Sequence, residues 1–286
     1  MPAPTAASMT RSPFFTRFSS MAVPKASGIV AGNARIIDRA SADRGHDAKP
    51  HMVDHPASAT DDWAAILERL YQRRFSAEDL AEMRVVWRVL VRSFLQRRIR
   101  HEATVVDLGA GACLFINEVR AARRIALDAN PGFRGLAGAG VETVVTTDLS
   151  LRELPDGSAG HFFVSNFLEH LPDFLAVLDL LARVRRKLEP GGSLLILQPN
   201  FRLAPRRYFN FIDHRVILTD VSLVEALEAV GFEIRELRAR FLPFTSKSSL
   251  PKWGWLVSLY LRFRPAQWLL GKQTFLVAVK PAGAHR

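Results

Sequence analysis

The sequence lacks the features that mark secreted and membrane-spanning proteins. Only one of its 286 residues is a cysteine, Cys113, which excludes a disulfide within the chain and a zinc module built on several cysteines. No run of 18 or more apolar residues occurs, so no segment is suited to cross a bilayer as a helix. The N-terminus has no continuous apolar core of signal-peptide length. These absences predict a cytoplasmic protein.

What is present is an ordinary globular composition with an uneven distribution of charge. Hydrophobic residues make up 48% of the chain and charged residues 23%, which excludes collagen-like and wholly disordered proteins. The formal net charge is +11, and residues 241–286 contain seven basic residues and no acidic one. A basic C-terminal end predicts contact with an anionic partner, without deciding between nucleic acid and a membrane.

Apolar periodicity divides the chain into three regions. Residues 1–58 show no sustained period, so we expect a disordered N-terminal tail. Residues 59–100 carry apolar residues at helical spacing, which predicts a helical cover. Residues 101–286 alternate short apolar strands with helices and form the main predicted domain, in which residues 242–272 are an aromatic and basic insert.

The alternation of strands and helices predicts an α/β fold. Short apolar strands separated by helices are typical of a doubly wound, mostly parallel sheet that is covered on both faces. Strands are expected over 102–107, 124–128, 141–147, 161–165, 193–198, 231–241 and 274–280, and helices over 114–123, 175–188 and 220–230.

Glycine and acidic residues stand at the ends of the first three predicted strands, where such sheets bind ligands. The first strand ends in Asp107-Leu-Gly109-Ala-Gly111, and glycines there allow a sharp turn close to a ligand. The second ends in Asp128, 19 residues after Gly109, whose carboxylate can accept hydrogen bonds from ribose hydroxyls. The third ends near Asp148-Leu149, placed to meet an adenine edge.

The first turn does not fit the nicotinamide-dinucleotide fingerprint G-x-G-x-x-G, because its sixth position is Leu114. Asp107 would repel a pyrophosphate, whereas it suits the ammonium group of an amino acid. These two features favour a nucleoside joined to an amino acid over a dinucleotide.

Five ordered blocks resemble those of class I S-adenosylmethionine-dependent methyltransferases: VVDLGAGAC, IALDAN, TTDLS, FFVSNFLEHLPD and LEPGGSLLILQPN. The resemblance covers about residues 103–281 and implies a Rossmann-like sheet of seven strands with an antiparallel last strand. It also implies S-adenosyl-L-methionine as the cofactor. Cys113 departs from the pattern, since it replaces the third glycine of the family motif.

The same resemblance implies a role for each matched residue of the cofactor site. Asp107, Gly109 and Gly111 would hold the methionine portion of the cofactor. Asp128 would hold the ribose, and Asp148 with Leu149 the adenine. Asn166 would line the site beside the sulfonium.

Two segments supply candidate catalytic residues, because a base is needed if the acceptor is a hydroxyl or a protonated amine. His214, beside Asp213, follows the fifth strand, and Glu169-His170 follows the fourth. The Glu169-His170 pair resembles residues that bind a divalent metal in quinone-precursor O-methyltransferases, but one such pair does not predict a metal here. Catalysis without a base, or with another residue, remains open.

The acceptor is the least determined part of the prediction. Residues 165–168 read Ser-Asn-Phe-Leu where nucleic-acid amino-methyltransferases carry Asp/Asn-Pro-Pro-aromatic, which argues against a nucleic-acid partner. We expect a small-molecule or lipid-linked acceptor, methylated at oxygen. The alternatives are an RNA or protein methyltransferase and a non-catalytic membrane-surface adaptor that keeps the fold.

Two aromatic segments allow more than one interpretation. Tyr208, Phe209 and Phe211 form either a substrate wall or a buried hinge. Residues 251–270 hold five aromatic and three basic residues. They either pack over the acceptor pocket as a helical hairpin or rest on an anionic membrane surface, in which case the protein would be peripheral at the inner membrane face.

Overall fold

The computed structural model describes residues 77–146, 148–244 and 253–283. Every described residue lies in the unit Ala64–Arg286. The predicted tail at 1–58 and the first part of the predicted helical cover, 59–76, lie outside the described residues.

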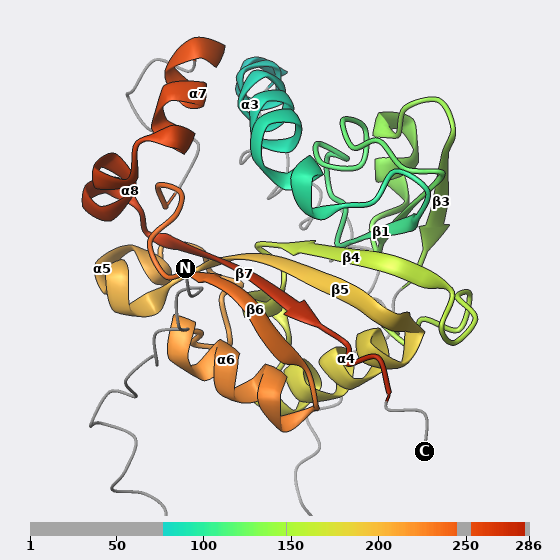
Figure 1. Cartoon of the computed structure of the whole chain (residues 1–286). Helices are drawn as coiled ribbons and strands as arrows, with labels where there is room; N and C mark the ends of the chain where they lie inside the picture. Colours follow the sequence, from blue (N-terminus) through green and yellow to red (C-terminus); the bar gives the residue numbers. More distant parts are fainter. Residues whose placement is uncertain (1–76, 147, 245–252, 284–286) are drawn as a thin grey trace, which may run out of the picture. The chain divides into compact units, whose positions relative to one another are not determined.

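A sheet of seven strands in the order β3-β2-β1-β4-β5-β7-β6 forms the centre of this unit (Figure 1). β7 runs antiparallel to β5 and β6, and the other neighbouring strands pair in parallel. This topology confirms the predicted doubly wound sheet with an antiparallel last strand. The strands are β1 Thr104–Leu108, β2 Arg123–Asp128, β3 Val141–Val145, β4 Ala159–Ser165, β5 Leu188–Pro199, β6 Glu233–Arg238 and β7 Gln273–Val279.

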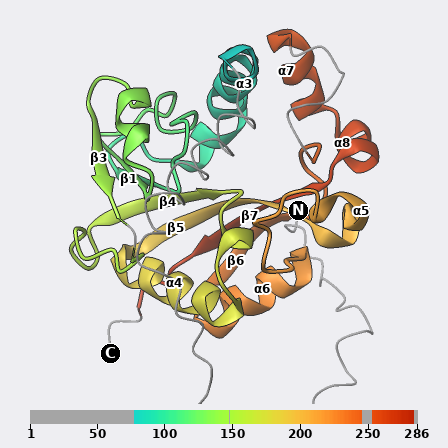
Figure 2. The ribbon, with the colours of Figure 1, turned by 180° about the vertical axis from the view of Figure 1, so that it is seen from behind.

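Helices cover both faces of the sheet, with α4 and α6 on one side and α3 and α7 on the other (Figure 1, Figure 2). None of the helices in the described parts of the chain is long and apolar enough to cross a bilayer. The helices are α3 Ala77–Leu90, α4 Phe174–Lys187, α5 Pro205–Tyr208, α6 Asp220–Ala229, α7 Gly254–Arg262 and α8 Arg264–Leu270; shorter or irregular helical segments are η3 Val91–Leu95, η4 Gln96–Arg98, η5 Pro131–Leu136, η6 Leu168–His170 and η7 Phe201–Leu203.

Successive side chains of the buried strands point to opposite faces of the sheet, so a separate apolar cluster forms on each face. In β1, Val106 and Leu108 join the cluster under α4 and α6, while Val105 joins the cluster under α3 and η3. The side chain of Asp173 starts α4 by accepting the N–H of Ala176 at 2.8 Å. The apolar residues of α4 then recur at helical spacing, so one stripe of this helix is buried.

The helix expected over 114–123 is wrong. This segment forms successive turns, and β2 already begins at Arg123. Cys113, directly before this segment, has a φ of +56°, so a right-handed helix cannot extend back through it. Phe115, Ile116 and Val119 are nevertheless buried, so the apolar spacing that suggested a helix here serves a series of turns.

Candidate functional site

The turn after β1 folds back over the end of β2 at the carboxyl edge of the sheet. The N–H groups of Gly109 and Ala110 both donate to the carbonyl oxygen of Leu127, at 2.9 and 3.0 Å. Gly109 has a φ of +74°, and a Cβ at this position would overlap the ring of Phe167. Only glycine therefore suits this position, for both its backbone conformation and its close approach to Phe167.

Asp128, the last residue of β2, connects this turn to β2 by a side-chain hydrogen bond. One carboxylate oxygen accepts the N–H of Gly111 at 2.8 Å, and the other accepts the N–H of Asn130 at 2.9 Å. A carboxylate has about four lone-pair positions, so both oxygens keep acceptor capacity for ribose hydroxyls. A Cβ on Gly111 would meet no atom within 4 Å, which shows open space beside the turn.

Asp107, at the end of β1, is 3% exposed. Burial, reinforced by the nearby charge of Asp128, raises the pKa of the Asp107 carboxyl to about 8, against the opposing effect of a hydrogen bond from the backbone of Ile116. A buried carboxyl in this state is suited to a cation, because an ammonium group beside it would favour ionisation. The predicted role of Asp107 toward the amino group of a methionine moiety fits this environment.

The predicted adenine-binding residues follow β3. The N–H of Thr146, directly after β3, donates to the carbonyl oxygen of Asp128 at 3.0 Å, so the ends of β2 and β3 lie together. The carboxylate of Asp148 accepts the N–H of Ser150 at 2.9 Å and pairs with Arg152 at 2.7 Å. Hydrogen bonding from Ser150, helped by the charge of Arg152, lowers the pKa of the Asp148 carboxyl.

Strained backbone gathers at the same edge of the sheet. In the described residues, four non-glycine residues have a positive φ, and all four follow the carboxyl end of β1, β3 or β4. Left-handed backbone disfavours residues with a Cβ and is often retained at binding sites. The φ of +56° at Cys113 explains why the family pattern has glycine there. The four residues are Cys113, Leu149, Leu151 and Asn166, two of which are predicted cofactor ligands.

The candidate catalytic residues, which the sequence left as two alternatives, form one cluster. Glu169 is fully buried, and its Oε1 lies 4.0 Å from Nε2 of His170 and 3.9 Å from Nε2 of His214. Its other oxygen, Oε2, accepts a hydrogen bond from the amide of Gln198 at 2.8 Å. Burial raises the pKa of the Glu169 carboxyl, and the neighbouring His170 opposes this effect.

The two histidines of the cluster differ in their surroundings. His170 is 30% exposed at its side chain, and its Nδ1 lies 3.1 Å from the backbone oxygen of Asp213 and 3.3 Å from its carboxylate. The side chain of His214 is 5% exposed and stacks on Phe211. One ligand atom from each of Glu169, His170 and His214 lies within 4.8 Å of the others, so the three side chains could hold a metal ion.

The aromatic residues after β5 take two different positions. Tyr208 is fully buried; its hydroxyl donates to the carbonyl of Val216 and accepts the N–H of Leu218. The burial of Tyr208 fits the second of the two alternatives and not a substrate wall. Phe209 is 54% exposed and remains available as a wall.

Comparison with known proteins supports the motif-based interpretation. Residues 106–196 match the family described as "Methyltransferase domain". Residues 106–196 are therefore a methyltransferase domain, and the chain has the fold of class I S-adenosylmethionine-dependent methyltransferases. Its matched region contains the turn after β1, Asp128 and the Glu169-His170 pair. No curated protein matches the chain at the level of sequence.

Three solved structures show that the methyltransferase has the fold of this class. Their sequence identities to this chain are too low to indicate its substrate. An S-adenosylmethionine-dependent methyltransferase from Archaeoglobus fulgidus aligns with a TM-score of 0.52 and 18% identity, over 74% of this chain and 99% of that one. A chain of the complex between a methyltransferase activator and a methyltransferase of Haloferax volcanii gives 0.53 and 16%, over 75% and 98%. An S-adenosylmethionine-dependent methyltransferase from Methanosarcina mazei gives 0.50 and 16%, over 66% and 97%.

The residues of the methyltransferase fit S-adenosylmethionine. Asp107 offers a buried carboxyl for the ammonium group, Asp128 offers acceptors for the ribose, and Gly111 leaves open space between them. The ligand roles of Asp107, Gly109, Gly111, Asp128, Asp148, Leu149 and Asn166 remain predictions that the structure is compatible with.

Two further residues of the site were not found from the sequence. Phe167 lies over Gly109, and Gln198 holds the buried carboxylate of Glu169. A polar residue at the end of the apolar strand β5 was the available signal for Gln198. Nothing local pointed to Phe167, since its contact is with a turn 58 residues earlier.

Proposed function

We propose that this methyltransferase methylates a hydroxyl oxygen of a small-molecule or lipid-linked acceptor, with the Glu169–His170–His214 cluster taking up the hydroxyl proton. The observation that carries the proposal is that a buried carboxylate and two imidazoles lie close together. The carboxylate, that of Glu169, comes three residues after Asn166 in the sequence. A hydroxyl must lose its proton as it is methylated, and imidazole is the usual group for that task near neutral pH.

His170 is the proton acceptor in this proposal. When its Nδ1–H donates to the backbone oxygen of Asp213, Nε2 of the neutral ring carries the free lone pair. The Asp213 carboxylate at 3.3 Å and Glu169 at 4.0 Å would both stabilise the imidazolium that forms. His214 is more deeply buried than His170, and we assign it a positioning role toward Glu169.

The surroundings of the cluster favour an apolar acceptor. Phe209 and Ile212 belong to the segment that brings His214 to the site, and their side chains are 54% and 86% exposed. Large apolar side chains this exposed, in the segment that carries His214, are suited to contact an apolar acceptor. They support a lipid-linked or hydrophobic hydroxyl compound over an ionic one.

The bound cofactor supplies a methyl group on a sulfonium, which is transferred in an in-line displacement. The acceptor hydroxyl would form the new O–C bond as the S–C bond of the cofactor broke and left a neutral thioether, and Nε2 of His170 would take up the hydroxyl proton. The residues of this chain mainly position the two reactants and accept the proton, and positioning alone can supply a large part of the rate.

The test uses S-adenosylmethionine with a labelled methyl group, the purified protein and cell extracts. We expect the label in a small or organic-extractable product, joined through an ether linkage that withstands mild base. Label that disappears after ribonuclease or protease treatment would contradict the proposed acceptor class. Label in a base-labile ester would contradict a hydroxyl acceptor.

A metal-assisted reaction is a second candidate, because the three side chains could hold an ion. A bound cation would acidify the hydroxyl, and the histidines would serve as ligands. Chelation distinguishes the two mechanisms: the base mechanism predicts an unchanged rate in EDTA. A rate that falls in EDTA and returns with a divalent cation would instead support the metal.

A further inference from the structure

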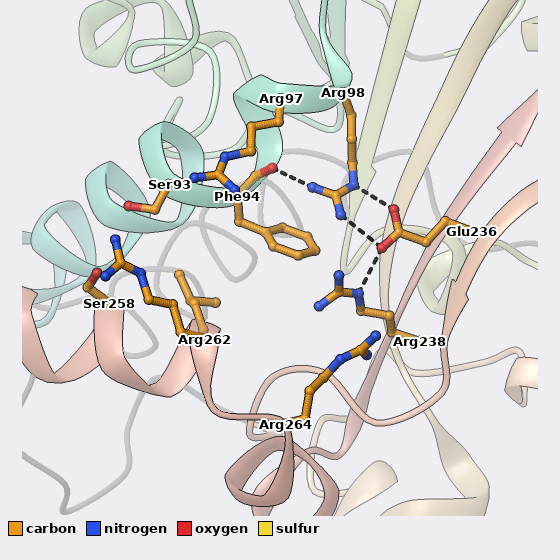
Figure 3. Close-up of a pocket in the computed structure, with 10 residues that line it drawn as sticks. Ser93, Phe94, Arg97, Arg98, Glu236, Arg238, Ser258, Arg262 and Arg264 are labelled. Atoms are coloured by element: carbon orange, nitrogen blue, oxygen red, sulfur yellow. Dashed lines mark hydrogen bonds and ion pairs between the residues drawn. The ribbon is translucent and has the colours of Figure 1, made fainter.

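A cavity of about 500 Å³ lies away from the Glu169 cluster, between helix and strand segments that are distant in sequence. Figure 3 shows the guanidinium groups of its lining around one space. Five arginines and one glutamate line the cavity, so the lining carries a net charge of +4. The arginines are Arg97 and Arg98 of η4, Arg238 of β6, Arg262 of α7 and Arg264 of α8.

The single glutamate is already shared by two of these arginines. Arg98 forms a two-pronged pair with Glu236, at 2.7 and 2.8 Å, and Arg238 donates to the same carboxylate at 2.8 Å. No carboxylate of the described residues forms an ion pair with Arg97, Arg262 or Arg264. Within the described parts of the chain, three guanidinium groups of the cavity lining thus lack an anionic partner, and this arrangement favours a bound phosphate.

The helices that supply Arg262 and Arg264 also carry an exposed apolar surface. One side of α7 is anchored to the protein: Leu261 is buried, and the hydroxyl of Tyr260 donates to the carbonyl of Phe241 at 2.6 Å. Large apolar side chains just before α7, on α7, at its junction with α8 and on α8 are 55–69% exposed. We call them the aromatic face: Trp253, Trp255, Leu259, Phe263, Trp268 and Leu269.

The aromatic face and the arginine cavity meet at the junction of α7 and α8. Arg262 and Arg264 flank the exposed Phe263 directly in sequence. In both views α7 lies beside α3, with α8 next to it (Figure 1, Figure 2). An exposed surface of Trp and Leu beside unneutralised arginines matches the interfacial region of a bilayer, where Trp rings sit at headgroup level and arginines meet phosphates.

We propose that the aromatic face rests on a membrane that contains anionic lipid, with a lipid phosphate held in the arginine cavity. The aliphatic members of the face favour this partner over RNA, because bases stack on aromatic rings but gain little from Leu259 and Leu269. Charge complementarity favours an anionic lipid over a neutral one. The inference is independent of the methyl acceptor, since it concerns only where the protein binds.

Sedimentation with vesicles tests the proposal. The full-length protein should sediment with vesicles of equal parts phosphatidylglycerol and phosphatidylcholine, and should stay in the supernatant with phosphatidylcholine alone. Binding should weaken as salt is raised, and tryptophan fluorescence should shift to shorter wavelength on binding. Recovery in the supernatant with both vesicle types would overturn the proposal.

Matched variants distinguish the effect of the cavity on vesicle binding from the effect of the net charge of the protein. Each basic residue near an anionic surface changes partitioning by about fivefold, so Arg262→Gln with Arg264→Gln should lower binding by about 25-fold. Arg134→Gln with Arg235→Gln removes the same charge from exposed residues outside the cavity and should have a much smaller effect. Equal losses in the two double variants would overturn the role of the cavity.

Variants of the aromatic face test its insertion into the membrane. Trp255→Ser and Trp268→Ser should each lower vesicle binding by about tenfold, since each loses most of the apolar area that it would bury. Their thermal stability and their stabilisation by S-adenosylhomocysteine should stay as in the unmodified protein, which keeps this test separate from methyl transfer. A variant that binds vesicles like the unmodified protein would overturn the proposed face.

Three other partners give distinct results. Inorganic phosphate that raises the melting temperature through Arg262 and Arg264, without any vesicle binding, would assign the cavity to a soluble phosphate compound. A homopolymeric RNA bound through the same residues, without vesicle binding, would assign it to nucleic acid. A concentration-dependent dimer that Trp255→Ser dissolves would assign the aromatic face to a second copy. Each result would overturn membrane docking.

Discussion

The cofactor edge and the Glu169 cluster differ in how the chain builds them. At the cofactor edge, residues 107–111 form one turn, and Asp128 reaches that turn from the next strand. The Glu169 cluster joins residues from two loops that are more than 40 residues apart. The cofactor edge is held mainly by backbone hydrogen bonds, whereas the cluster consists of three ionisable side chains, of which Glu169 and His214 are buried.

This difference predicts which amino-acid substitutions each region should tolerate. A backbone-built turn depends on conformations that only certain residues adopt, so small changes of residue type should matter there. In the proposed mechanism the cluster takes up a proton, so removal of a single ring nitrogen should affect the reaction more than the fold. Substitutions in the two regions should therefore change different measured quantities.

The largest expected effect is on turnover. His170→Ala should lower the turnover number by about 10²–10⁴-fold, since it removes the proposed proton acceptor, while the affinity for S-adenosylhomocysteine stays unchanged. The measurement is the initial rate with the identified acceptor, alongside calorimetric binding. His101→Ala, at an exposed histidine outside the cluster, is the control and should keep the full rate. An equal rate in both variants would remove His170 from the mechanism.

The next largest effect is a pH dependence at the cofactor edge. Because the pKa of Asp107 is raised to about 8, its carboxyl is protonated below that pH, while an ammonium ligand favours the ionised form. Affinity for S-adenosylhomocysteine should therefore rise by up to about tenfold per pH unit between pH 6 and 8, and then level off. Titration calorimetry measures the effect, and the slope should vanish in Asp107→Asn. A flat profile in the unmodified protein would contradict the ligand role of Asp107.

The same pKa gives a stability effect with a defined sign. Between the usual aspartate pKa near 4 and about 8, the folded protein keeps a proton that the unfolded chain releases. The free energy of unfolding of the cofactor-free protein should therefore fall as pH rises through this window. Denaturant titrations at several pH values check this, and Asp107→Asn should show the weaker dependence. A stability that rises across the window would contradict the raised pKa.

The smallest expected effect is a difference in unfolding free energy between substitutions at two glycines. Gly109→Ala and Gly157→Ala both place a Cβ on left-handed backbone, which costs about 1–2 kcal/mol of unfolding free energy. Gly109→Ala should cost about 1–3 kcal/mol more, because its Cβ meets Phe167, while the Cβ at Gly157 meets nothing within 4 Å. Urea titrations measure both. Equal losses would show that the contact with Phe167 carries no constraint.

The fold and the cofactor edge could be predicted from the sequence because their signals are local. Most of the strands carry their own apolar run, β6 being the exception, and Asp107, Gly109 and Gly111 stand within five residues. The wrong helix at 114–123 shows the limit of a local pattern: Phe115 and Val119 are buried, but by successive turns and not by a helix. The left-handed backbone at Cys113, directly before this segment, has no apolar signal in the sequence.

The cluster and the arginine cavity could not be predicted, because both depend on contacts across the fold. Glu169 and His214 were considered as separate sites, and only the path of the chain after β5 brings them within 3.9 Å. The cavity takes arginines from η4, β6, α7 and α8. The basic C-terminal composition indicated an anionic partner but not the place where the charges meet.

The central claim is that the edge formed by β1, β2 and β3 binds S-adenosylmethionine independently of the Glu169 cluster. Thermal melting with S-adenosylhomocysteine at about 100 times its dissociation constant tests it most directly. The expected gain is about 2.7 kcal/mol of unfolding free energy for the unmodified protein and for His170→Ala. Asp128→Ala should lose most of this gain, and Asp179→Ala, on the surface of α4, should keep it. Stabilisation by NAD instead, or an undiminished gain in Asp128→Ala, would contradict the account.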